Sequence, residues 1–260
     1  MYTDKAPEVE ASLKYIQEHL VEPLSLEEIS HQAGYSPYHF TRLFKAHMGI
    51  PLFYYVSALR LQKAKDLLIH TDFTIRDIAL EVGHQSLGTF TTRFTEKVGI
   101  SPAAFRQTRT EGERVLEKLH ELSERKTLID ASSGHCSITG TIEGDVPYQG
   151  VVLVGLFPKP IPEGMPLYGT LAMLPGEFCL SGIQPGIYYL MATSLSWGME
   201  AEGILLTHKT LRTRDHKPLT ITPGTLPPHL KVKLYPPKLD DPPIVVSLPI
   251  LMKRYLKRNQ

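Results

Sequence analysis

The chain has 260 residues, a hydrophobic content of 42% and a formal net charge of only +1. This length predicts about two domains, and the hydrophobic content is ample for ordinary cores. The near-neutral charge excludes a strong electrostatic field over the whole surface as a basis for binding nucleic acid. The first seven residues lack the apolar core of a signal peptide, and no later run approaches the length of a membrane span. We therefore expect a cytoplasmic protein without a membrane partner.

A helix-turn-helix pattern lies between residues 25 and 49. Ser25-Leu26-Glu27-Glu28 has the spacing of a capping box that begins a helix, and Gly34 marks the turn after it. Ser36-Pro37 supplies the N-cap and the first-turn proline of a second helix, which Gly49 ends. The second helix should face inward with Phe40, Leu43, Phe44 and Met48, and a preceding helix should cover the unit with Val9, Leu13, Ile16 and Leu20.

The segment from Leu52 to His70 predicts one long helix, because it contains no Gly or Pro and is rich in helix formers. A helix of roughly 20 residues is about 30 Å long, which is close to the ~34 Å of one turn of B-DNA. Such a rod could hold two reading helices in adjacent major grooves on the same side of a duplex.

The first pattern is repeated between residues 74 and 106. Thr74 and Asp77 form a capping-box-like start, Gly83 ends the first helix, Gly99 ends the second, and Ser101-Pro102 begins a third. The apolar faces carry Ile75, Ile78, Ala79, Val82, Leu87, Phe90, Phe94 and Val98. Phe40, Phe44, Gly49 and Tyr55 correspond to Phe90, Phe94, Gly99 and Phe105 at one constant offset of 50 residues. Two copies are too few for a solenoid and indicate a tandem pair.

Basic residues gather within this pattern although the net charge is small. No Asp or Glu lies between Ser36 and Lys65, and Glu96 alone lies between His84 and Arg109. The same segments contain Arg42, Lys45, Arg60, Lys63, Lys65, Arg93, Lys97, Arg106 and Arg109. A local basic stripe of this kind is what contact with phosphate requires.

Residues 8–107 resemble the DNA-binding domain of AraC/XylS-type transcription regulators. The resemblance rests on LEEISHQAGYSPYHFTRLFKAHMG, on ALRLQKAKDLL, and on IRDIALEVG followed by F, RF and GISPAAFR. It implies a sequence-specific DNA-binding transcription regulator with two recognition helices in successive major grooves. The chain departs from the family pattern at His84, where the family usually has an aromatic residue, and at Thr92, where it usually has arginine.

We expect the solvent-facing residues of the two recognition helices to contact DNA, because residues near the N-terminus of such a helix meet base edges. In the first unit these are Ser36, Tyr38, Thr41, Arg42 and Lys45, and in the second they are Gln85, Ser86, Thr89, Thr92, Arg93 and Lys97. Arg42 is the candidate for a bidentate guanine contact, with a phosphate contact as the alternative. The second unit has fewer long donors and should discriminate bases less sharply.

The predicted fold class is an all-α tandem helix-turn-helix domain followed by an antiparallel β-sandwich. The predicted boundaries are 1–107 for the DNA-binding domain, 108–133 for a helical linker, 134–250 for the sandwich and 251–260 for a basic tail. The linker stripe Val115, Leu119 and Leu122 should pack against a domain. The expected strands are CSITGTI, VVLVGLF, YGTLAML, EFCLSGI, IYYLMATSL, GILLTH, LKVKLY and IVVSL.

The stretch from Gly176 to Leu190, GEFCLSGIQPGIYYL, resembles the middle of carboxypeptidase-regulatory-like (prealbumin-like) β-sandwich domains. This resemblance implies a fold and no chemistry. Trp197, with Tyr188, Tyr189 and Met191 nearby in the sequence, either packs in the core or lines an effector pocket.

Nothing in the sequence indicates an enzyme, a cofactor or a metal site. No G-x-S-x-G, H-E-x-x-H or phosphate-binding glycine loop is present. Cys136 and Cys179 are far apart, and we expect them to be buried thiols. His208, Asp215, His216 and His229 lack close ligand spacing and are expected to be solvated loop residues.

The expected partner is double-stranded DNA. RNA polymerase and an unknown small-molecule effector are further candidates, and a monomer and a homodimer both stay open. The alternative function is a glycan- or peptide-binding β-module that a DNA-binding domain localises. The sequence does not decide between activation and repression.

Overall fold

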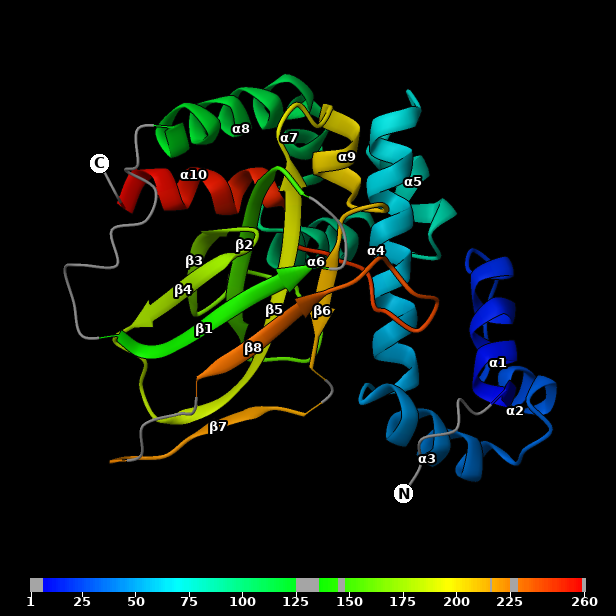
Figure 1. Ribbon diagram of the computed structural model, residues 1–260. Helices are drawn as coiled ribbons and strands as arrows, with labels where there is room; N and C mark the ends of the chain where they lie inside the picture. Colours follow the sequence, from blue (N-terminus) through cyan, green and yellow to red (C-terminus); the bar gives the residue numbers. More distant parts are fainter. Residues whose placement is uncertain (1–6, 125–135, 145–147, 216, 225–228, 259–260) are drawn as a thin grey trace.

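The computed structural model describes residues 7–124, 136–144, 148–215, 217–224 and 229–258. A helical half, residues 7–108, and a β-rich half, residues 109–258, lie side by side, with one long helix running between them (Figure 1). None of the described helices is long and apolar enough to cross a membrane.

The helical half contains seven helices in the described residues. They are α1 Pro7–Glu18, α2 Leu26–Gln32, α3 Pro37–Met48, α4 Leu52–His70, α5 Ile75–Glu81, α6 Leu87–Val98 and α7 Pro102–Gln107. We call α2–α3 the first unit and α5–α6 the second unit. Both predicted capping boxes are present, Ser25 with Glu28 and Thr74 with Asp77. The turn glycine of each unit, Gly34 or Gly83, has a φ of 74° or 78°, a conformation that favours glycine.

The aromatic residues that correspond at the 50-residue offset pack in the same way in the two units. In the first unit, Phe40 contacts Phe44 and Phe44 contacts Tyr55, with ring centroids 5.9 Å apart in both pairs. In the second unit, the rings of Phe90 and Phe94 are 5.7 Å apart and those of Phe94 and Phe105 are 5.8 Å apart. All six rings are fully buried, so each unit has its own aromatic core. The predicted helix from Leu52 to His70 is confirmed as α4, whose buried residues belong to the same hydrophobic cluster as both cores.

The β-rich half begins with α8 Arg109–Glu124 and contains two larger sheets. Its further elements are β1 Cys136–Gly144, β2 Gly150–Phe157, β3 Tyr168–Met173, β4 Gly176–Ser181, β5 Gly186–Ser196, α9 Ala201–Leu206, β6 Arg212–Arg214, β7 Leu219–Ile221, β8 Leu230–Leu234 and α10 Leu248–Arg258. One sheet has the order β4-β1-β8 and the other β3-β2-β5-β6, with β7 paired to β5. The pairings are antiparallel except for β1 with β8, which is parallel and departs from the all-antiparallel expectation.

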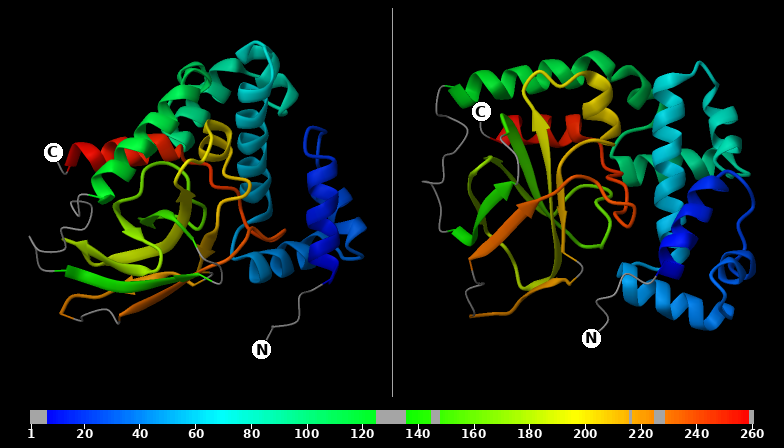
Figure 2. Two further views of the ribbon diagram at one scale, coloured as in Figure 1. Left: turned by 45° about the horizontal axis from the view of Figure 1, so that its top comes forward. Right: turned by 45° about the vertical axis from the view of Figure 1, so that its right-hand side comes forward.

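Both faces of the five-stranded sheet are apolar, and other elements of the β-rich half cover both of them. Residues on one face, such as Val152 and Val154, share a core with Ile142 of β1 and Val232 of β8 in the other sheet. Residues on the opposite face, such as Leu153, pack beneath α8, α9 and α10. Figure 2 shows α8 and α10 lying together over this sheet. The linker helix expected before residue 133 is therefore α8, and it packs against the five-stranded sheet through residues that include Val115 and Leu119.

Several expectations for the β-rich half are wrong. GILLTH was expected as a strand but lies mainly in α9, where Ile204, Leu205 and Leu206 are all buried. A short buried helix and a buried strand give the same continuous apolar run, so the pattern could not separate them. IVVSL, residues 244–248, forms no strand. Residues 244–247 are a buried segment without regular secondary structure, and Leu248 begins α10. The Val245 N–H donates to Pro162 O, and the Ser247 N–H donates to Val98 O.

Two further expectations about this half are also corrected. Residues 251–260 were expected to be a solvated basic tail, whereas residues up to Arg258 belong to α10. The buried residues Leu248, Met252 and Leu256 recur every four positions across the predicted boundary and place the helix on the sheet. Cys179 was expected as a thiol and is in a disulfide. Of the proposed loop histidines, His216 lies outside the described residues.

The two halves are joined by one continuous core. Ile161, Leu205, Leu206 and Val245 of the β-rich half are buried in the hydrophobic cluster that contains α4 and both units. Polar contacts also join α4 to the β-rich half. The side chain of Gln62 donates to Leu206 O, and Lys65 Nζ donates to Ile244 O at 3.0 Å. The β-rich half thus packs along α4, the helix that connects the two units.

Candidate DNA-binding surface

The polar faces of α3 and α6 remain open to solvent although the β-rich half packs on the same domain. Ten of the eleven predicted contact residues are exposed. They are Ser36, Tyr38, Thr41, Arg42, Lys45, Gln85, Ser86, Thr89, Thr92 and Arg93. Tyr38 is 74% exposed, the highest value among the large hydrophobic side chains of the described residues. The exposed ring at the start of α3 is therefore free to contact another molecule.

In α3 the exposed side chains are arranged by the helix itself. Pro37 occupies the first turn, and Ser36 is the N-cap residue with no hydrogen bond from its side chain to the helix. Thr41 Oγ1 donates to Pro37 O at 2.8 Å, so the hydroxyl is turned back to the helix and its methyl group faces outward. The Arg42 guanidinium lies 5.8 Å from the centre of the Tyr38 ring. This contact can hold Arg42 extended over the helix N-terminus.

In α6 the N-terminal turn is also exposed but carries shorter side chains. Ser86 Oγ accepts from the Thr89 backbone N–H at 3.4 Å, so Ser86 caps the helix. A Cβ atom added to Gly88 would meet only Ser86 Oγ, at 3.8 Å, which leaves an open surface there. Thr92 and Arg93 follow one turn later and are exposed.

His84 takes the place of the family's usual aromatic residue in structure as well as in sequence. Its ring packs edge-on against Phe90 with centroids 5.4 Å apart. Burial, followed by the nearby Arg93 and Arg60 guanidiniums, lowers the pKa of His84. A neutral ring suits a packing role and not a phosphate contact.

Lys97 is the one predicted contact residue that the structure removes from the surface. Its Nζ pairs with Glu163 Oε2 at 2.8 Å, and the two side chains are only 18% and 4% exposed. Lys97 Nζ also lies 4.9 Å from the centre of the Tyr54 ring, and Lys97 O accepts from the Gly164 N–H at 2.6 Å. The last turn of α6 is therefore docked on the β-rich half. No sequence signal marked this pairing, because Lys97 and Glu163 are far apart along the chain and belong to different elements.

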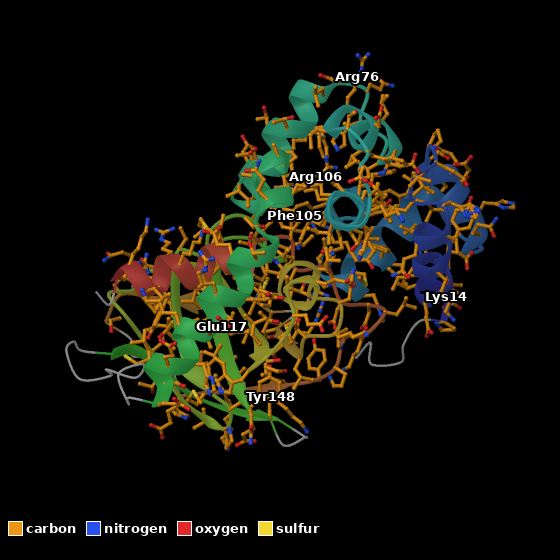
Figure 3. All side chains as sticks on the ribbon, turned by 90° about the horizontal axis from the view of Figure 1, so that it is seen from above. Lys14, Arg76, Phe105, Arg106, Glu117 and Tyr148 are labelled. Carbon is orange, nitrogen blue, oxygen red and sulfur yellow. The ribbon has the colours of Figure 1, made fainter. Side chains whose placement is uncertain are left out.

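Two other arginines of the predicted basic stripe are also engaged within the fold. Arg60 Nε donates to Leu20 O and its Nη2 to Glu22 O. Arg106 donates to Leu68 O and to Phe73 O, and Figure 3 shows it beside α4. These two arginines therefore stabilise the helical half by donating to backbone carbonyls of neighbouring segments.

Arg76 is a further exposed basic residue that was not among the predicted contact residues. It is exposed in the first turn of α5, and in Figure 3 it points outward at the edge of the helical half. The equivalent place in the first unit, counted from the cap residue, is Glu27. This reversal of charge was the signal available in the sequence.

The described residues contain no group of three or more His, Cys, Asp or Glu side chains arranged to hold a metal ion. The arrangement offers hydroxyl, amide, phenol and guanidinium donors on the exposed faces of two capped helices. These groups suit base edges and phosphates.

Comparison with known proteins identifies the type of domain in the helical half. A family model described as a helix-turn-helix domain matches residues 29–108. The regulatory protein PocR of Salmonella typhimurium is 35% identical over 96 residues, which cover 37% of this chain and 32% of PocR. The bifunctional transcriptional activator/DNA repair enzyme AdaA of Bacillus subtilis is 40% identical over 99 residues, which cover 38% of this chain and 47% of AdaA.

A solved structure of a transcriptional regulator from Chromobacterium violaceum, named for AraC-type DNA-binding domain-containing proteins, is 29% identical to this chain. It covers 39% of this chain and 91% of its own, with a TM-score of 0.38. The chain spans a third to a half of the length of the curated relatives named above. The family match ends at residue 108. Residues 29–108 therefore form a helix-turn-helix domain.

Proposed function

We propose that this chain is a sequence-specific transcription regulator that places α3 and α6 in successive major grooves of double-stranded DNA. The observation that carries the proposal is the exposure of both polar helix faces in the presence of the β-rich half. The length of α4 supports it. Its 19 residues form a helix about 28 Å long, near the ~34 Å between successive major-groove faces. In this proposal residues 1–107 are the DNA-reading domain.

The first unit is the more discriminating reader in this proposal. Arg42 has the exposed fork that pairs with guanine O6 and N7, and Tyr38, Thr41 and Lys45 surround it on α3. The second unit offers Gln85, Ser86, Thr89, Thr92 and Arg93, of which only Arg93 carries a charge. Short hydroxyl side chains pair with several bases, so the half-site of the second unit should be less sharply defined.

The β-rich half serves ligand sensing or association in this proposal. Two sheets with a shared apolar core support its relation to the carboxypeptidase-regulatory-like sandwiches. The other function is a glycan- or peptide-binding β-module that the helical half localises on DNA. The continuous core with α4 favours sensing, because a ligand-induced change in the β-rich half would reach both units.

The test is selection of bound sites from random DNA by the whole chain, followed by footprinting. We expect a footprint of about two helical turns. Arg42→Ala should weaken binding to the selected site by about 1–3 kcal/mol and relax one position of the site. Arg114→Ala on α8, an exposed arginine of the β-rich half, is the charge-matched control and should have little effect. Equal loss on every sequence would mean that Arg42 contacts phosphate, and no selected motif at all would overturn the proposal.

A further inference from the structure

A mainly apolar cavity lies in the β-rich half between the five-stranded sheet and α10. Its volume is about 80 Å³. Its apolar walls come from the sheet, from residues 244–247 before α10 and from α10 itself. They include Leu153, Phe157, Leu171, Met191, Val246 and Leu251. These residues belong to the cluster beneath α8, α9 and α10. An apolar cavity with a few converging polar groups is the usual form of a small-molecule site.

The polar part of the lining is supplied by two arginines of β6. Arg212 and Arg214 are two residues apart on a strand, so their side chains lie on one face of the sheet. Burial lowers the pKa of both guanidinium groups. Arg212 Nη2 donates to Thr207 O at 2.5 Å and its Nε to Thr210 O at 3.4 Å. Arg214 donates to Asp240 O at 3.2 Å and to Met48 O, while its buried Nε has no acceptor.

Neither arginine has a carboxylate partner within ion-pair distance among the described residues. Asp241, which also lines the cavity, stabilises the charge of both arginines from further away, and Asp240 does the same for Arg214. The two carboxylate oxygens of Asp241 accept from the Tyr235 hydroxyl and the Lys238 N–H. Arg254 and Arg258 of α10 add two exposed guanidinium groups to the lining. Among the described residues, four arginines and one aspartate therefore line the cavity. Burying cations beside apolar walls is unfavourable unless an anion compensates them.

We propose that this cavity binds a small aliphatic carboxylate. The carboxylate pairs with the guanidiniums that line the cavity, Arg214 among them, and the hydrocarbon part occupies the space between Leu153, Phe157 and Leu251. A carboxylate matches the planar guanidinium fork, and the apolar walls exclude a fully hydrated inorganic anion. The volume is about half that of a cavity that accepts benzene, so the fitted part of the chain has only a few carbons.

Arg214 also connects the cavity to the first unit. Its Nη2 donates to the carbonyl oxygen of Met48, the last residue of α3. A carboxylate at Arg214 competes with this carbonyl for the same guanidinium. Because α3 is the proposed reading helix, ligand binding changes the position of α3 and hence the affinity for DNA. This second step rests on the proposed function, whereas ligand binding itself does not.

The binding step is tested by calorimetry on the full chain with acetate, butyrate, hexanoate and octanoate. Matched primary alcohols, alkylamines and inorganic phosphate are the comparison probes. Each carboxylate should bind at least tenfold more tightly than the alcohol or amine of the same length. Affinity should rise along the series and then level off once the cavity is filled. Alcohols or phosphate that bind as tightly as the carboxylates would overturn the proposal, as would no binding of any carboxylate.

Variants assign the binding to this cavity. Arg214→Gln should lower carboxylate affinity at least tenfold, whereas Arg76→Gln, which removes an exposed arginine of α5, should leave it unchanged. If Arg214→Gln fails to fold, Leu251→Trp fills the cavity from α10 and keeps both buried arginines. A folded Leu251→Trp chain should lose the binding. Unchanged affinity in that chain would place the ligand elsewhere and overturn the assignment.

The coupling step has a separate measurement. DNA affinity of the full chain should change several-fold when the best carboxylate is added, and the change should disappear in Leu251→Trp. Carboxylate binding with unchanged DNA affinity would overturn the Arg214–Met48 coupling alone. A chain that binds the carboxylate but no DNA sequence would overturn the proposed function and leave the cavity assignment intact.

Discussion

The two units have equal aromatic cores but are held differently by the β-rich half. The last turn of α6 is held by three neighbouring contacts, through Lys97 and Glu163, through the Gly164 N–H and through the Ser247 N–H. The last turn of α3 is held by one charged side chain, because Arg214 donates to Met48 O. Internal repetition in the sequence therefore does not imply equal freedom in the fold. The second unit is fixed to the β-rich half, and the first is the one whose position can change.

The largest expected effect comes from breaking the helix that separates the units. Ala64 is fully buried near the middle of α4, and Ala64→Pro removes a backbone hydrogen bond and clashes with the preceding turn. The cost should be about 3 kcal/mol or more in the free energy of unfolding, measured by urea denaturation. In chains that still fold, the footprint should shrink to one groove. Lys63→Ala, at an exposed position of the same helix, is the control. A folded Ala64→Pro chain with the full footprint would show that one unit carries the binding.

The next largest effect should come from releasing the second unit. Glu163→Gln leaves the Lys97 ammonium largely buried against Tyr54 without its carboxylate. The free energy of unfolding should fall by roughly 2–3 kcal/mol, less than for a fully buried pair because Lys97 is partly exposed. Lys159 pairs with the same carboxylate but is 60% exposed, so Lys159→Gln should cost less than about 1 kcal/mol. Equal losses in the two variants would contradict the docking role of Lys97.

Lys65 of α4, the helix that connects the two units, should make the free energy of unfolding depend on pH. Lys65 is fully buried, and burial lowers its pKa to about 7. In the unfolded chain the lysine keeps its ordinary, higher pKa, so above neutral pH the unfolded state binds the extra proton. The free energy of unfolding should therefore rise with pH, by roughly 2 kcal/mol between about pH 7.5 and 9.5.

Urea unfolding across this pH range measures the effect of Lys65. Lys65→Met should flatten the rise, whereas Lys63→Met on the exposed side of α4 should keep it. A rise of the same size in Lys65→Met would assign the pH dependence to other groups.

Local chemistry made the helical half predictable, and long-range contacts limited the prediction of the rest. Ser25 with Glu28, Thr74 with Asp77 and the left-handed Gly49 and Gly99 involve residues within one turn of each other, so the sequence alone indicates them. The exposed positions around Arg42 follow from helical periodicity in the same way.

The β-rich half departs from its prediction where the apolar run is ambiguous or the partner is remote. The buried run in α9 has no periodicity that separates helix from strand. The segment 244–247 is hydrogen-bonded to Pro162 and Val98 and not to a strand. The partner of Lys97 comes from a loop between β2 and β3. The exposed positions near the N-terminus of a recognition helix could be predicted, whereas the contacts at the end of the same helix depend on the whole fold.

The smallest expected effect concerns the salt dependence of DNA binding. The two ends of α6 should contribute to it differently. Arg42, Lys45 and Arg93 are exposed, whereas Lys97 is paired with Glu163, so about three counterions should be released on binding DNA. At about −0.9 for each phosphate neutralised, the slope of log K against log salt should lie near −3 for one chain. Arg93→Ala should make the slope less steep by about 0.9, and Lys97→Ala should leave it unchanged in a chain that still folds. If Lys97→Ala changes the slope as much as Arg93→Ala does, Lys97 leaves Glu163 when DNA binds. The β-rich half would then have to move away from α6, and the second unit would not be the fixed one.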